Sequence, residues 1–114
     1  MDKSVFLEDL DAFAYREALA SGEAIVLIPV GSLEQHGPHL PLGTDTILSS
    51  HFAEGVARRL GALVAQPIAY GYKSQQKSGG GNHLPGTVSL DGGTLTGVAR
   101  NLVKSFLKQG VRHV

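Results

Sequence analysis

The segment AIVLIPVGSLEQHGPHLPLGTDT, residues 24–46, carries the strongest indication of how this chain folds. It begins with an unbroken apolar run, residues 24–30, that is rich in β-branched side chains. A run without polar alternation is typical of a strand that is buried on both faces, as in a parallel sheet. The loop that follows this predicted buried strand contains three residues whose side chains can bind metal, namely Glu34, His36 and Asp45.

Helical and extended patterns alternate along the rest of the chain. Such alternation predicts an α/β fold in which right-handed helical crossovers join the strands of a parallel sheet. The predicted elements are a helix over 9–22, a strand over 24–30, a helix over 45–60, a strand over 62–68, a helix over 91–109 and the start of a third strand at 111–114.

The predicted helices have recognisable ends. Asp9 or Asp11 can cap the start of the first helix, and Gly61 and Gly110 can end the second and third. The second helix has large apolar side chains at every fourth position, namely Leu48, Phe52, Val56 and Leu60.

Two polar, glycine-rich loops follow the two predicted strands. One begins after residue 30 and the other covers residues 69–89. In parallel sheets, ligands gather at the carboxyl ends of the strands. We therefore expect the two loops to lie together at one end of the sheet.

The composition excludes several classes of function. Ten basic and ten acidic residues cancel among 114, which argues against nucleic acid or an anionic membrane as the main partner. The chain has no cysteine, so disulfides and thiolate metal sites are absent. The acidic N-terminal segment lacks the apolar core of a signal peptide, and no run is long enough to span a membrane. We expect a cytoplasmic protein.

The first loop has the residue types of a metal site. Glu34 and His36 are separated by one residue, so in an extended chain they point to the same side. Asp45 lies at or just before a helix start, where a carboxylate is electrostatically favoured. Carboxylate and imidazole ligands suit zinc or manganese. Spacing alone leaves an alternative open, namely a loop of ordinary surface polar groups in which Asp45 is a helix cap.

The motif VGSLEQHGPHLPLGTDT, residues 30–46, strongly resembles the signature of the creatininase family of metal-dependent amidohydrolases. The segment YGYKSQQKSGGGNHLPGTVSLDGGTLTG, residues 70–97, is similar to the creatinine-hydrolysing members in particular. The resemblance implies a three-layer αβα fold with a parallel sheet. Residues 1–114 would form the N-terminal portion of a single creatininase-like domain, cut after the start of the third strand.

The resemblance also implies a site for two divalent ions, zinc and/or manganese. Glu34 would ligate one ion, His36 the second, and Asp45 would bridge them. A water activated by the metals would then attack the ring carbonyl of creatinine and open the cyclic amide to give creatine, without a protein nucleophile.

Four further residues receive roles from the resemblance. Ser78 would contact creatinine, whereas His39, Asn82 and His83 would support the shape of the pocket. The glycines beside Ser78 do not form a nucleotide-binding motif, because no Lys-Ser pair follows them.

Members of the family are longer than this chain, and the resemblance places their remaining metal ligands just beyond Val114. We therefore expect these 114 residues alone to be catalytically inactive. The resemblance also implies a homo-oligomer, commonly a hexamer, for the full-length protein. Two alternatives remain: a family member that hydrolyses another amide or a formamide, and a non-catalytic remnant.

Overall fold

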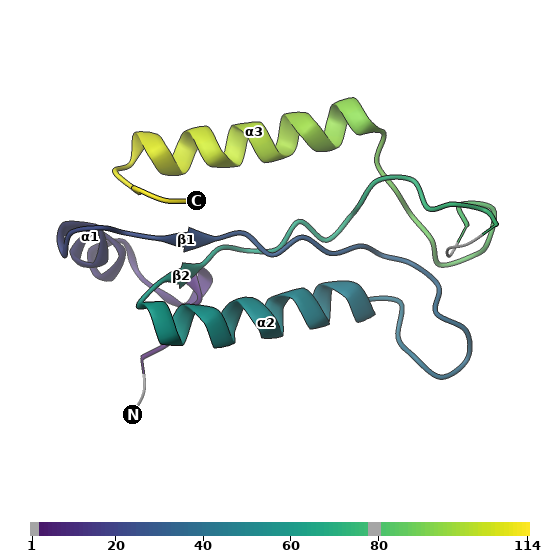
Figure 1. Ribbon diagram of the computed structural model, residues 1–114, viewed down its shortest axis with the longest axis horizontal. Helices are drawn as coiled ribbons and strands as arrows, with labels where there is room; N and C mark the ends of the chain where they lie inside the picture. The colour runs from purple at the N-terminus through teal and green to yellow at the C-terminus, as the bar shows by residue number, and fades with distance from the viewer. Residues whose placement is uncertain (1–2, 78–80) are drawn as a thin grey trace.

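The computed structural model describes residues 3–77 and 81–114. Figure 1 shows two short strands side by side, with one long helix, α2, on one side and another, α3, on the other, which is the predicted three-layer αβα arrangement. None of the helices in the described residues is long and apolar enough to cross a membrane. The elements are the 3-10 helix η1 (Leu7–Asp9), α1 (Ala12–Ala20), β1 (Val26–Leu27), α2 (Thr44–Leu60), β2 (Leu63–Val64) and α3 (Gly92–Lys108).

The sheet is parallel, as predicted. Val26 of β1 pairs with Leu63 of β2. On the other side of β1, His113 forms a parallel bridge with Ile25, so residues 111–114 do begin to pair as a third strand. The N-terminal segment forms a further parallel bridge, from Phe6 to β2, which the sequence had not suggested.

Regular pairing covers less of the chain than the predicted strands over 24–30 and 62–68. It is interrupted after two residues and resumes at a bridge between Val30 and Ile68. Each segment contains a proline, at positions 29 and 67, which has no N–H to donate to the sheet. Between the Leu27–Val64 pair and the Val30–Ile68 bridge, the later segment also has one residue more than the earlier segment. The two segments nevertheless stay together up to the first loop, where the Gly31 N–H donates to the Ile68 carbonyl at 2.8 Å.

Alternate residues of the strands face opposite helices, as the pleat of a strand requires. Val26, Ala65 and Val111 form a buried cluster against which Phe106 of α3 packs. On the other face, Val64 belongs to a second buried cluster, which includes residues 57 and 62. The sheet is therefore covered by apolar side chains on both faces, which its unbroken apolar sequence predicted.

Helix α2 packs through its small side chains. Ala57 is fully buried and Ala53 packs beside it, against the cluster around Val64. Phe52, by contrast, is 70% exposed. The whole stripe of large apolar residues at every fourth position faces outward in this structure, namely Leu48, Phe52, Val56 and Leu60, and Ile47 is exposed as well.

The helix ends follow the local signals in the sequence. Asp11, rather than Asp9, caps α1 by accepting a hydrogen bond from the Ala14 N–H at 2.8 Å. Gly61 ends α2 with a left-handed conformation, φ 69°. Asp91 caps α3.

Candidate metal centre

The two polar loops lie together at the end of the sheet to which the strands point (Figure 1). The Val88 N–H donates to the Leu33 carbonyl at 3.0 Å, so the second loop runs antiparallel to the first. Thr87 of the second loop is a buried polar residue. Its Oγ1 accepts a hydrogen bond from the Gln35 N–H at 3.1 Å. The second loop thus holds the backbone between Glu34 and His36.

Glycine allows the first loop to touch the start of α2. A Cβ atom on Gly31 would lie 2.5 Å from the Cα of Thr46 and 2.7 Å from its backbone nitrogen. A Cβ atom on Gly71 would lie 3.1 Å from the Gly31 carbonyl oxygen. The approach at Gly31 brings the first turn of α2, which contains Asp45, against the end of the β1 segment, and the approach at Gly71 brings the start of the second loop against the same place.

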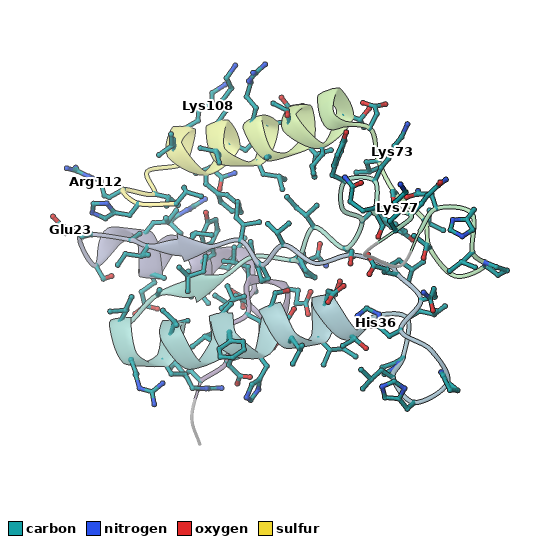
Figure 2. All side chains as sticks on the ribbon, turned by 45° about the vertical axis from the view of Figure 1, so that its right-hand side comes forward. Glu23, His36, Lys73, Lys77, Lys108 and Arg112 are labelled. Carbon is teal, nitrogen blue, oxygen red and sulfur yellow. The ribbon has the colours of Figure 1, made fainter. Side chains whose placement is uncertain are left out.

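Glu34, His36 and Asp45 come together at this junction. Each offers one ligand atom, and these atoms all lie within 4.8 Å of one another. The Nε2 atom of His36 is 3.5 Å from Oδ1 of Asp45. Figure 2 shows His36 beside the first turn of α2, at the end of the molecule that also carries Lys73 and Lys77. We call this group the candidate metal centre; that it binds metal remains a prediction.

The hydrogen bonding of His36 favours metal ligation through Nε2. Its Nδ1 lies 2.8 Å from the Glu34 carbonyl oxygen, which can only accept, so Nδ1 carries the proton of the neutral ring. The lone pair of Nε2 is then free on the side of Asp45. The Glu34 carbonyl raises the pKa of His36 above its ordinary value, and the carboxylates of Asp45 and Glu34 act in the same direction, whereas burial opposes them.

Asp45 is not the N-cap of α2, which was the alternative role that the sequence left open for it. The N-cap position of α2 is Gly43, and Asp45 lies within the first turn. Its Oδ2 accepts a hydrogen bond from the Ser32 hydroxyl at 2.6 Å, while Oδ1 faces His36. The sequence analysis missed Ser32, although its position two residues before Glu34 places it on the same side of an extended chain.

The predicted supporting residues lie in the loops around the centre. Asn82 accepts a hydrogen bond from the Ser74 N–H at 2.9 Å and so braces the second loop. His39 is exposed and its ring lies beside Gly37, where a Cβ atom would be 3.6 Å from it. His83 is also exposed. Ser78 lies outside the described residues, and the proposed roles of all four remain predictions.

Comparison with known proteins gives a consistent family. A family model described as Creatininase: Creatinine amidohydrolase matches residues 8–114. The chain is 47% identical over 114 residues to the creatinine amidohydrolase of Pseudomonas putida. This alignment covers all of this chain and 44% of that protein. It is 35% identical over 108 residues to the 3-dehydro-scyllo-inosose hydrolase of Thermotoga maritima, covering 95% of this chain and 33% of that protein.

Solved structures agree with the sequence matches. A crystal structure of creatinine amidohydrolase matches with a TM-score of 0.93 and 48% identity, covering 98% of this chain and 43% of that one. A creatininase described as a Mn form gives 0.93 and 48%, covering 97% and 43%. A creatininase mutant described as Zn-Zn type gives 0.90 and 48%, covering 96% and 42%.

The match therefore involves both the sequence and the three-layer arrangement of the chain. The chain spans less than half the length of these relatives. Within that span, the family model covers all but the first seven residues. The chain belongs to the creatininase family.

Proposed function

We propose that this chain supplies part of the metal centre of a creatinine amidohydrolase, and that the complete enzyme converts creatinine to creatine. The observation that carries the proposal is the cluster of Glu34, His36 and Asp45 at the strand ends. The identity of 47% to a creatinine amidohydrolase supports creatinine as the substrate.

The ligand atoms suit zinc or manganese. Two carboxylates and an imidazole are the donors that such borderline ions accept, and the neutral His36 ring with its proton on Nδ1 would offer the lone pair of Nε2. Similar creatininase structures described as Mn and Zn-Zn forms support the same metals. We propose that Glu34 ligates one ion, His36 a second and Asp45 both.

The reaction adds one water across the ring C–N bond of creatinine. Oxygen joins the carbonyl carbon, the C–N bond breaks, and the ring nitrogen gains a proton, which gives creatine. When bound, divalent ions in such a centre would lower the pKa of a water and polarise the carbonyl. The residues of this chain would hold the ligand atoms in place: the Glu34 carbonyl fixes the ring of His36, and Thr87 fixes the backbone between the two ligands.

The second loop supports creatinine as the substrate class. It lies directly against the metal-binding loop through Thr87 and Val88. Its sequence over residues 70–97 resembles the creatinine-hydrolysing members. We propose that Ser78 contacts creatinine and that Asn82 braces the loop around it.

A second candidate is hydrolysis of another small molecule. The identity of 35% to an inosose hydrolase favours it, because that relative also covers almost the whole chain. The two candidates share the metal centre and differ in the substrate.

Metal binding is tested first on the purified chain, by titration calorimetry with zinc and with manganese. We expect His36→Gln to weaken zinc binding by about tenfold or more, because it removes one ligand. The matched control is His51→Gln, since His51 is an exposed histidine of α2 that contacts the Phe52 ring. Equal zinc affinity of wild type and His36→Gln would contradict the assignment of His36.

Activity is tested in a chimera. In the Pseudomonas putida enzyme, the segment that aligns with this chain is replaced by residues 1–114 of this chain, all of which are covered by the alignment. We expect the chimera to open creatinine, Asp45→Asn to abolish this activity, and His51→Gln to leave it unchanged. A chimera that folds and binds zinc but prefers another substrate would overturn creatinine in favour of the second candidate.

A further inference from the structure

We propose that Ser32 is a positioning residue of the metal centre, which fixes the carboxylate of Asp45 in the orientation that metal binding needs. This inference rests on the proposed function. It adds a residue that does not itself ligate the metal.

The two oxygens of Asp45 have different neighbours. Oδ2 accepts the hydroxyl hydrogen of Ser32 at 2.6 Å. Oδ1 faces Nε2 of His36 at 3.5 Å. Since a carboxylate only accepts, the Ser32 proton must point at it, and this bond determines which oxygen is presented to the other ligands.

Packing does not fix the Asp45 side chain by itself. The side chain is 41% exposed, compared with 20% for His36. An exposed carboxylate rotates readily about its last torsion, for which the preferences are broad. Of the two side-chain contacts of Asp45 given above, the hydrogen bond from Ser32 is much the shorter, at 2.6 Å compared with 3.5 Å to His36, so it is the one that selects the orientation.

Ser32 is itself held firmly at the junction. Its carbonyl accepts a hydrogen bond from Oγ1 of Thr46 at 3.3 Å. The backbone of Gly71 packs beside it, because a Cβ atom there would be 3.3 Å from the Ser32 Cβ. Ser32 thus connects the end of the β1 segment to the first turn of α2 through both its side chain and its backbone.

A hydroxyl that donates to a ligand carboxylate acts on the metal through that ligand. Such outer contacts orient the ligand, and their loss typically lowers metal affinity about 10–100-fold. We expect this range for zinc and manganese when the Ser32 hydroxyl is removed.

The experiment compares Ser32→Ala, Ser32→Thr and wild type by calorimetric titration with zinc and manganese. Ser32→Ala is expected to lose about 10–100-fold in affinity, and Ser32→Thr, which keeps the hydroxyl, to recover most of it. The matched control is Ser49→Ala, because the Ser49 hydroxyl bonds to the Thr46 carbonyl and not to a ligand. Ser49→Ala should bind metal as wild type does.

The melting temperature of each metal-free variant separates positioning from general stability. A positioning role predicts that Ser32→Ala loses affinity while its metal-free melting temperature stays near that of wild type. Unchanged affinity, or a loss that Ser32→Thr does not restore, would overturn the proposal. If Ser32→Ala does not fold, Ser32→Gly deletes the same hydroxyl and is judged by the same criteria. Wild type that binds neither metal would refute the proposed function itself, and this inference with it.

Discussion

At the scale of single residues, Gly31 is the position where the junction tolerates least change. A Cβ atom there would overlap the backbone of Thr46 in the first turn of α2. Gly31→Ala must therefore shift the helix start, and overpacking of this kind destabilises a protein by about 1–3 kcal/mol. We expect a lower free energy of unfolding in urea and, because Asp45 moves with the helix, weaker zinc binding.

Gly97 provides the matched control for this substitution. It lies inside α3, and among the residues that the structure describes no heavy atom outside its own helix neighbourhood comes within 4 Å of the position of an added Cβ. Gly97→Ala should raise the free energy of unfolding by up to about 1 kcal/mol, as expected for alanine in a helix. If both variants changed stability equally, the close approach at Gly31 would not be the cause.

The sequence identified the three proposed ligands but not the contact that orients one of them. Glu34 and His36 could be placed together because alternate residues of an extended segment share a side. The distance to Asp45 depends on where α2 begins and how closely it approaches Gly31, which no local pattern fixes. A single serine such as Ser32 has no distinctive signature, so its role becomes visible only in the structure.

At the scale of elements, α2 shows which of two apolar faces packs on the sheet. Ala57 is fully buried, whereas Phe52 is 70% exposed. Phe52→Ala should therefore change the free energy of unfolding by no more than about 0.5 kcal/mol, as is usual at surface positions. Ala57→Leu should lower it by about 1–3 kcal/mol, because the helix would be forced away from the sheet. Urea denaturation of both variants measures the difference, and a larger loss for Phe52→Ala would contradict the observed orientation of α2.

The large apolar residues of α2 do not mark the face of the helix that packs on the sheet. The large residues at every fourth position form the more obvious stripe, but they lie on the outer face. Small side chains allow the helix axis to approach the sheet closely, and Ala53 and Ala57 provide that face. A search for large apolar residues cannot distinguish an alanine face that packs closely on a sheet from an alanine face that does not pack.

The start of α3 gives a prediction for pH. Asp91 accepts a hydrogen bond from the Thr94 N–H, and this bond, followed by that from the Thr94 hydroxyl, lowers the pKa of Asp91 below its ordinary value. A carboxyl whose pKa is lower in the folded state stabilises the fold above its unfolded pKa, and the contribution disappears as the pH falls through the folded value. Asp91→Asn keeps a capping oxygen but does not titrate. The free energy of unfolding of this variant should therefore fall less than that of wild type between pH 5 and pH 2.

At the scale of the whole molecule, the layer order and the pairing of residues 111–114 beside β1 could be predicted, whereas the pairing of the N-terminal segment at the other edge of the sheet could not. Alternating helices and buried strands require a parallel sheet between helices, and caps such as Asp11 and Gly61 fix the helix ends locally. The pairing of Phe6 with β2 depends on contacts between residues far apart in sequence. The strands are short because of the prolines at positions 29 and 67, which lack the N–H that pairing needs. The sequence shows these prolines, but which pairings they interrupt depends on the register of the two strands.

Hydrogen exchange tests this order of segments across the sheet. The Val64 N–H donates to the Val5 carbonyl at 2.8 Å, and the Val26 N–H donates to the His113 carbonyl at 2.9 Å. Both residues are almost fully buried, so their amides should exchange only when the sheet opens. The Glu34 N–H, which bonds to the Leu42 carbonyl in the first loop, should exchange faster because loops open more readily. If Val26 and Val64 instead exchanged as fast as Glu34, neither outer segment would be paired in solution, and the candidate metal centre would lack the rigid sheet that the proposed positioning by Ser32 requires.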